Sequence, residues 1–164
     1  MDIRKTFEYA LRREYEGKRF FEENAARLSH AAAVGAFKEL AAEEQRHIVF
    51  IQGQIDAINQ GLPASSETLD RELKEGSFFS NRAHSEMLEQ TVMEAMVPDL
   101  PVLRTAYLIE KDFAEYYEKS ATEATGESKK VLEMLAKWER GHEALFKQLF
   151  DKAQEVYEKM PWGG

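Results

Sequence analysis

The feature that most constrains the fold is a polar pair set into an apolar helix stripe, and the chain carries it twice. Glu44 and His47 stand three residues apart, so both side chains point from one face of a helix. Glu139 and His142 repeat this spacing near the end of the chain. The residues that continue the face of the first pair are apolar: Phe37, Leu40, Ile51, Ile55 and Ile58. Each pair therefore occupies positions where core residues are expected.

A single glutamate on an earlier apolar stripe precedes each pair. From Glu14 to Glu44 is 30 residues, and from Glu110 to Glu139 is 29. The chain therefore consists of two copies of one helical hairpin. This repeat predicts an all-α protein, a four-helix bundle built from two αα-hairpins that a long crossover connection joins.

Helix start and stop signals give this architecture its expected boundaries. Gly61 and Pro63 end the second helix, Pro101 begins the third, and Gly126 separates the third from the fourth. We expect a single domain over 1–164, because this length suits one core. The expected helices run from Ile3 to about Leu28, Ala31 to about Gln60, Asp99 to about Thr125 and Ser128 to Lys159. The first two helices form hairpin 1 at about 3–60, and the last two form hairpin 2 at about 99–159. The crossover at 61–98 lies between the hairpins, and we expect it to include a shorter helix from Asn81 to Val97.

Composition excludes several classes of protein. The chain has no cysteine, which removes disulfides and Cys-ligated iron or zinc. The formal net charge is −8, with lysine and arginine spread along the chain, so we expect no nucleic-acid partner. The start lacks the apolar segment of a secretory signal, and no apolar run is long enough to cross a bilayer. We therefore expect a cytoplasmic protein without a membrane partner.

The polar groups on the apolar stripes need a positive partner. Burying one unpaired carboxylate costs several kcal/mol, and four would cancel the ~5–15 kcal/mol stability of a domain. Two divalent cations balance four carboxylates, as do two trivalent ions with an oxo bridge. Carboxylate oxygen and imidazole nitrogen favour iron or manganese over copper, and zinc also accepts them. We therefore predict two iron ions, with manganese or zinc as alternatives, bound by the ligand set of di-iron carboxylate bundles: Glu14, Glu44, His47, Glu110, Glu139 and His142.

Four segments around these groups match a known pattern: Glu14 to Phe21, Glu39 to His47, Ile109 to Asp112 with Tyr116 and Tyr117, and Glu139 to His142. They resemble the rubrerythrin-like branch of the ferritin-like superfamily. The resemblance covers essentially both hairpins, leaves the crossover unmatched, and implies a ferritin-like fold. It also implies that Glu44 and Glu139 bridge the two metals. Glu14 and His47 would then complete one metal site, and Glu110 and His142 the other.

The chain departs from the family pattern in two ways that concern the peroxidase cycle, one in electron supply and one in the redox-linked movement of iron. Full-length rubrerythrins carry a Cys-ligated rubredoxin domain, which has no counterpart here. We therefore expect a separate, rubredoxin-like electron donor. Rubrerythrins also carry an additional carboxylate one turn after the third-helix glutamate, where this chain has Phe113. The resemblance further implies a homodimer, and the long crossover would allow helices to be swapped between its two chains.

Three neighbours of the ligands have weaker signals. Tyr117 lies two turns after Glu110 and is the candidate catalytic residue, because its hydroxyl could hydrogen-bond near a bound oxidant. Core packing explains this tyrosine equally well. Gly17, one turn after the first-helix glutamate, leaves space either for a small oxidant or for close helix packing. Trp138 immediately precedes a bridging glutamate, so we expect it to face away from the metals.

The leading hypothesis is a non-haem di-iron oxidoreductase that reacts Fe(II) with hydrogen peroxide or dioxygen, with rubrerythrin-like peroxide scavenging preferred. The first alternative is a bacterioferritin-like ferroxidase that stores iron in a cage, because both Glu-x-x-His pairs fit it. The long crossover and the lack of an obvious fifth helix weigh against storage. A di-iron hydroxylase would need a pocket for an organic substrate formed by residues 61–98. A metal-free bundle used for interaction ranks last.

Overall fold

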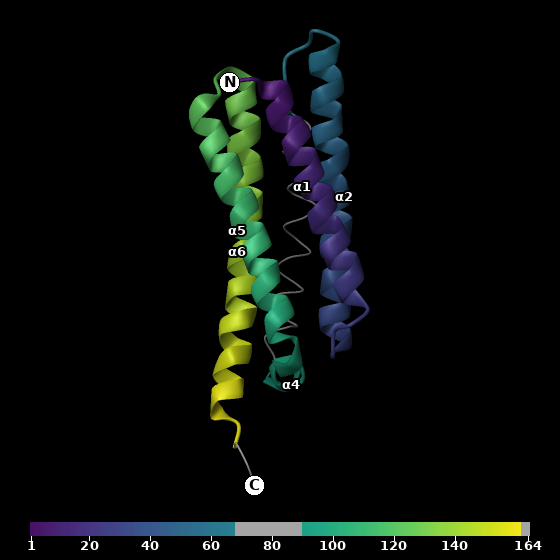
Figure 1. The fold of residues 1–164 in the computed structure, drawn as a ribbon, viewed down its shortest axis with the longest axis vertical. Helices are drawn as coiled ribbons and strands as arrows, with labels where there is room; N and C mark the ends of the chain where they lie inside the picture. The colour runs from purple at the N-terminus through teal and green to yellow at the C-terminus, as the bar shows by residue number, and fades with distance from the viewer. Residues whose placement is uncertain (68–89, 162–164) are drawn as a thin grey trace.

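A computed structural model of the chain describes residues 1–67 and 90–161, and every regular element in these ranges is helical. Four long helices run along the longest axis of the molecule (Figure 1). The all-α bundle that the periodicity predicts is thus confirmed. The long helices are α1 (Ile3–Ala25), α2 (Ala31–Asn59), α5 (Leu100–Glu123) and α6 (Gly126–Lys159), and α5 is preceded by the short helix α4 (Gln90–Ala95) and the 3-10 helix η1 (Val97–Asp99).

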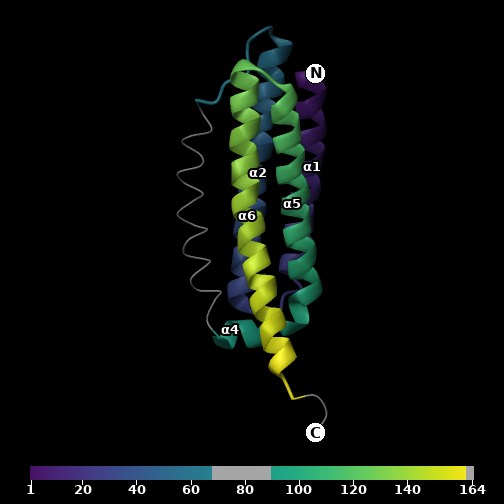
Figure 2. The ribbon, with the colours of Figure 1, turned by 90° about the vertical axis from the view of Figure 1, so that its left-hand side faces the viewer.

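The long helices pair as two hairpins. Figure 1 shows α1 beside α2 on one side and α5 beside α6 on the other. The view turned by 90° shows α4 lying across the end of the bundle at which α5 begins (Figure 2). The backbones contact one another more extensively within each hairpin than between α1 and α5. The space between the hairpins is therefore bridged mainly by side chains.

Local signals explain the ends of the first hairpin. The Asp2 side chain caps α1 by accepting a hydrogen bond from the backbone N–H of Lys5 at 3.2 Å. At the far end of α2, the N–H of Leu62 donates to the carbonyl of Ala57 at 2.9 Å. Gly61 supplies the left-handed residue of this Schellman turn, with φ at +76°. The glycine expected to stop the second helix does so through its conformational freedom.

Among the helix ends that differ from the sequence-based expectation are the end of α1 and the start of α6. α1 ends at Ala25 rather than near Leu28, because the backbone closes into a tight turn in which the N–H of Arg27 donates to the carbonyl of Asn24 at 2.9 Å. α6 begins at Gly126, two residues before the expected start at Ser128. Gly126 has a φ of +59°, which lets the chain turn sharply at this residue, and the helix therefore begins there.

The crossover is described at its two ends. The side chain of Gln54, in α2, forms hydrogen bonds of 2.8 and 3.1 Å with the backbone N–H and carbonyl of Ser65, which lies beyond the end of the helix. Before α5, the buried carboxylate of Asp99 accepts hydrogen bonds from the backbone N–H and the hydroxyl of Ser29, at 3.0 and 3.1 Å. Asp99 therefore fastens the turn of hairpin 1 to the start of hairpin 2. Most of the helix expected from Asn81 to Val97 lies outside the described residues.

The buried apolar side chains form two clusters, one toward each end of the bundle. Phe21, Phe37 and Phe146 pack together in the first cluster, with ring centroids 5.5 to 5.6 Å apart. Phe7 belongs to the second cluster. On α1, Glu14 lies between Phe7 of one cluster and Phe21 of the other, and the corresponding polar residues interrupt each of the other long helices in the same way. The predicted ligands thus form a polar layer between two apolar ones.

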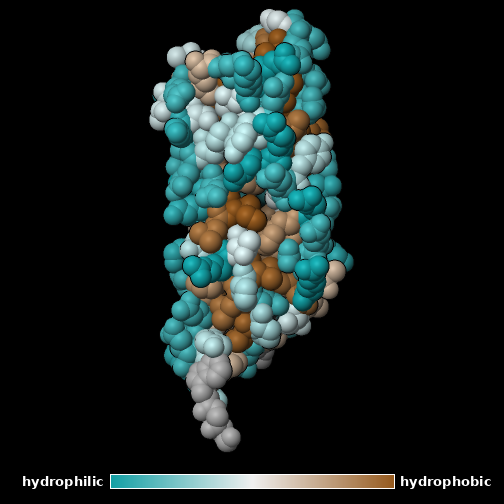
Figure 3. Space-filling view, in the orientation of Figure 1, coloured by the Kyte–Doolittle hydropathy of each residue, from teal (hydrophilic) through white to brown (hydrophobic). Residues whose placement is uncertain are grey.

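The hydropathy of the residues on one face of the molecule can be followed in Figure 3. Figure 3 shows hydrophilic residues over most of one face, interrupted by hydrophobic patches in its middle and lower parts. In the described part of the chain, no helix combines the length and the apolar character needed to cross a membrane.

Candidate metal centre

The structure brings all six predicted ligands together in the middle of the bundle. Each long helix contributes: α1 and α5 one glutamate each, α2 and α6 one Glu-x-x-His pair each. The four carboxylates are fully buried, and the more exposed of the two histidines is only 3% exposed. The helix stripes therefore direct charged groups into the interior, as the sequence predicts.

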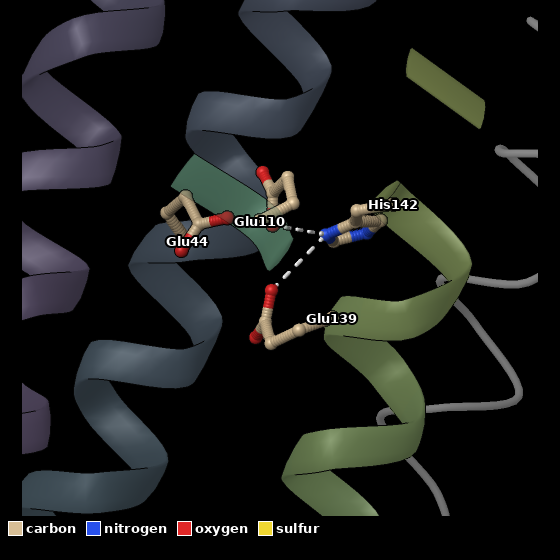
Figure 4. A group of neighbouring side chains, drawn as sticks. All are labelled: Glu44, Glu110, Glu139 and His142. Atoms are coloured by element: carbon tan, nitrogen blue, oxygen red, sulfur yellow. Dashed lines mark ion pairs between the residues drawn. The ribbon is translucent and has the colours of Figure 1, made fainter. Parts of the chain in front are cut away.

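One half of the centre surrounds His142. Ligand atoms of Glu44, Glu110, Glu139 and His142 all lie within 4.8 Å of one another. Figure 4 shows the imidazole of His142 turned toward the carboxylates, and its Nδ1 lies 3.5 Å from an oxygen of Glu110 and 3.5 Å from an oxygen of Glu139. This arrangement gives one cation a site with three carboxylates and one imidazole.

The other half surrounds His47. Ligand atoms of Glu14, His47 and Glu139 form a second group within 4.8 Å. Nδ1 of His47 lies 3.1 Å from Glu14, 3.0 Å from Glu139 and 3.6 Å from Glu44. Glu139 belongs to both groups, and the rings of His47 and His142 lie nearly parallel with centroids 6.1 Å apart. The carboxylate of Glu139 therefore lies where it could serve two cations, one beside each imidazole.

The donor set fits two cations. Among the described residues, no hydrogen-bond partner meets either carboxylate oxygen of Glu44, Glu110 or Glu139, although all are buried. Nδ1 of His142 is likewise without one in the described chain. Buried polar atoms without partners are rare because each costs about 1–3 kcal/mol. Carboxylate oxygens and imidazole nitrogens are ligands that iron and manganese bind. Their close grouping without hydrogen-bond partners among the described residues therefore fits such cations.

In the metal-free protein, protons balance this charge. Burial and the charges of nearby carboxylates raise the pKa of Glu44 well above its usual value, and burial raises that of Glu110 to about 8. Burial alone would lower the histidine pKa values, but the adjacent carboxylates outweigh it and raise the pKa of both His47 and His142. For Glu139, the two neighbouring imidazoles outweigh burial and lower the pKa. Metal binding must therefore release protons.

Tyr117 lies against the metal ligands. Its side chain is 1% exposed, and its hydroxyl donates a short hydrogen bond to Oε1 of Glu14. Burial and the charge of Glu14 raise the pKa of Tyr117 well above its usual value. The hydroxyl thus stays protonated and holds one oxygen of Glu14 while the other faces His47. Tyr117 is thus a core tyrosine whose hydroxyl binds a predicted ligand on another helix, and its role near a bound oxidant stays a prediction.

Gly17 does not open a space for an oxidant. A Cβ at this position would lie 3.0 Å from Cε2 of Phe113 and 3.7 Å from an oxygen of Glu44. The Phe113 ring fills the place opposite the glycine, and the guanidinium carbon of Arg13 lies 4.9 Å from the centre of that ring. Of the two readings of Gly17, close packing is the one that the structure supports.

Glu43 is a buried carboxylate that the sequence reasoning missed. It is 0% exposed, and its Oε2 lies 2.7 Å from Nε2 of His142, on the side of the ring away from the ligands. Its other oxygen lies 3.4 Å from the guanidinium of Arg46, whose positive charge offsets the negative charge of this additional carboxylate. A signal was present, since Glu43 stands on a buried stripe with three- and four-residue spacing: Ala36, Leu40, Glu43, His47, Phe50 and Gln54.

Trp138 does not face away from the centre, so that expectation is wrong. Its side chain is 7% exposed, and its ring packs against His47 with centroids 4.0 Å apart and an interplanar angle of 61°. Adjacent positions on a helix are about 100° apart, and α6 is buried over an arc wide enough to hold both Trp138 and Glu139.

Fold and site together define a class of protein, a helical bundle whose long helices enclose the ligand set of a di-iron carboxylate centre. Comparison with protein-family models matches residues 5–150 to Rubrerythrin, and the chain belongs to this family. The resemblance drawn from the sequence is thus confirmed, and the family and the buried Glu and His groups support iron binding. Searches of curated proteins and of solved structures returned no match.

Proposed function

We propose that this protein is a non-haem di-iron oxidoreductase that uses Fe(II) to reduce hydrogen peroxide. The observation that carries the proposal is the buried layer in which four carboxylates and two imidazoles meet from four helices. Many of their facing atoms have no hydrogen-bond partner in the described chain, which only cations or protons can compensate. Membership of the rubrerythrin family supports iron as the cation.

Each ligand has a role in this proposal. Glu14 and His47 would hold one metal, Glu110 and His142 would hold the other, and Glu44 and Glu139 would serve both. Two ferrous ions would supply the two electrons that, with two protons, convert hydrogen peroxide into two molecules of water. The four carboxylates would balance the charge of two ferrous ions, and two ferric ions would need two further negative charges.

The surrounding residues position the ligands and exclude water. The hydroxyl of Tyr117 orients Glu14 by its hydrogen bond, and the ring of Trp138 supports His47. Phe113 closes the side of the site next to Gly17. With every ligand at most 3% exposed, bulk water is kept from the metals, which strengthens the electrostatic interactions inside the site.

We extend the proposal to the partners of the protein. The chain has no cysteine, so electrons for the next cycle would come from a separate donor, for which we propose a rubredoxin-like protein. The ligand-bearing helices of one chain already bring all six groups together, so a homodimer, which we also propose, does not need swapped helices to complete the site. We propose a cytoplasmic location.

The test combines metal analysis with rapid mixing. The purified protein, loaded anaerobically, should hold two iron ions per chain. Its ferrous form should be oxidised faster by hydrogen peroxide than by dioxygen in a stopped-flow experiment. Glu14→Gln should reduce both iron content and oxidation rate. The exposed Glu16 on the same helix provides the matched control, because Glu16→Gln removes a carboxylate of equal size outside the site.

Three results would argue against the proposal. Iron content below one ion per chain would remove the dinuclear centre. Oxidation by dioxygen as fast as by peroxide would remove the preference for peroxide. A native mass of many subunits, with an iron core that grows on oxidation, would favour storage over a dimeric enzyme.

A further inference from the structure

The two halves of the centre differ at one position of the repeat. The residue immediately before the bridging glutamate is Glu43 in hairpin 1 and Trp138 in hairpin 2. Both side chains reach across to the histidine of the opposite hairpin. Oε2 of Glu43 lies 2.7 Å from Nε2 of His142, whereas Trp138 places its ring 4.0 Å from the ring of His47. The two hairpins thus carry the same types of ligand, but different residues support their histidines.

A second position of the repeat changes together with the first. The residue immediately before the histidine is Arg46 in hairpin 1 and Gly141 in hairpin 2. The guanidinium of Arg46 lies 3.4 Å from Glu43, and its side chain is 35% exposed. Arg46 therefore offsets the buried charge of Glu43 while its other face stays in contact with solvent. Hairpin 2 has neither the carboxylate nor the cation that would accompany it.

This difference determines how firmly each imidazole is held. Both histidines present Nδ1 to the carboxylates, so Nε2 carries the proton when Nδ1 binds a metal. In His142 that N–H can donate to Glu43, which fixes the ring and makes it a stronger ligand. In His47, Nε2 has no hydrogen-bond partner among the described residues, and the adjacent indole offers only its ring. An aromatic ring is a much weaker hydrogen-bond acceptor than a carboxylate.

We propose that the two halves of the centre bind metal with unequal affinity, and that Glu43 is the positioning residue that makes the His142 half the tighter one. The proposal rests on the dinuclear centre proposed above and adds an order of loading: the His142 half fills first, and the His47 half exchanges its metal more readily. Loss of the outer partner of a metal-bound histidine typically lowers affinity about 10- to 100-fold. We expect a difference of that size between the two halves.

Single-site variants allow each half to be measured alone. Anaerobic titration of the metal-free chain with Co(II), followed by its visible absorption, reports binding to each half. His47→Ala leaves the His142 half and should bind one Co(II) about 10- to 100-fold more tightly than His142→Ala, which leaves the His47 half. Equal affinity of the two variants, or tighter binding by His142→Ala, would overturn the proposal.

The role of Glu43 is tested in the same two backgrounds. Glu43→Leu should lower Co(II) affinity about 10- to 100-fold with His47→Ala and by less than about twofold with His142→Ala. Glu43→Gln, which keeps an acceptor oxygen, should recover part of the loss. Equal weakening in both backgrounds would show a structural effect on the whole bundle and would refute the role of Glu43. If circular dichroism shows that Glu43→Leu does not fold, Glu43→Gln is compared in the same two backgrounds instead. A larger loss of Co(II) affinity with His47→Ala than with His142→Ala as background would support the role of Glu43, and equal weakening in both would refute it.

The wild-type titration separates the two proposals. Two Co(II) ions per chain together with equal single-site affinities would contradict only the inequality of the halves. No stoichiometric binding of Co(II) or Fe(II) by the wild type would instead contradict the proposed dinuclear centre.

Discussion

The metal-free protein should lose stability as the pH rises from 5 to 8. Burial raises the pKa of Glu110 from 4.5 to about 8 in the folded chain. A group with a raised folded-state pKa stabilises the fold fully below its unfolded pKa, and this contribution is lost as the pH rises through the folded value. The pKa values of Glu44, His47 and His142 are raised as well, so all four groups act in the same direction.

The size of the effect follows from the proton held by Glu110. Between pH 5 and 8 the folded chain keeps this proton and the unfolded chain does not, so stability falls by at most about 1.4 kcal/mol per pH unit for this group. Over three units this is roughly 4 kcal/mol, a large part of the ~5–15 kcal/mol stability of a domain. The lowered pKa of Glu139 adds no slope here, because its contribution is lost only as the pH falls below its unfolded value.

Metal loading should reverse the trend. A divalent cation takes the place of the protons on the carboxylates and on Nδ1 of each imidazole, so protons compete with it at low pH. Stability of the loaded protein should therefore rise with pH over the range in which that of the metal-free protein falls. The opposite signs of the two slopes distinguish a metal centre from a buried network that merely holds protons.

Urea unfolding followed by far-UV circular dichroism measures both slopes. The metal-free protein is unfolded in excess chelator at several pH values between 5 and 8, and the series is repeated with Glu110→Gln. In this variant, the free energy of unfolding should fall less steeply with pH than in the wild type, by up to about 1.4 kcal/mol per pH unit, because the proton held by Glu110 is absent. Glu16→Gln, on the exposed face of α1, should keep the wild-type slope. A metal-free stability that rises with pH, or an unchanged slope in Glu110→Gln, would refute the reasoning.

Three further substitutions test the parts of the site separately. Tyr117→Phe removes the donor to Glu14 and should cost about 1–3 kcal/mol of metal-free stability, measured by urea unfolding. Glu44→Leu should raise the stability of the metal-free chain by up to about 1–3 kcal/mol, because a buried carboxyl group without a hydrogen-bond partner among the described residues is replaced by a packed apolar group, while metal analysis finds less than two ions per chain. Asp99→Ala removes both hydrogen bonds to Ser29 and should lower stability by about 1–3 kcal/mol. Its metal content should stay at the wild-type value, and a loss would show that the link between the hairpins also shapes the site.

The sequence was sufficient for the bundle and for the set of groups that meet in it. Each long helix carries its apolar stripe at helical spacing, and a charged residue on such a stripe must be carried into the core with it. Glu14 and Glu110 could therefore be placed inside without knowing how the helices pack. The family follows from the same residues, and the match over residues 5–150 agrees with it.

Glu43 and Trp138 escaped prediction for a shared physical reason. A stripe drawn at i, i+3, i+4 and i+7 assumes that each helix is covered from one direction. In this bundle α2 packs along α1 and also receives side chains from α6, since Glu43 meets His142 at 2.7 Å. The buried arc is therefore wider than one stripe, and residues next to a ligand in sequence are still inside. A charged residue is assumed to be exposed unless its partner is known, and the partner of Glu43 lies 99 residues away in the chain.

That both errors fall on equivalent positions of the repeat has a physical meaning. The ligands of both hairpins meet in one buried layer, so two hairpins with the same stripe place them with approximate two-fold symmetry. The residue before each of the glutamates Glu44 and Glu139 also reaches the neighbouring hairpin, where it contacts the opposite histidine. Nothing in the periodicity of a helix requires those two contacts to be alike. A carboxylate supported by Arg46 occupies one of them and an indole the other, so a symmetric set of six ligands can hold two metals that are chemically different.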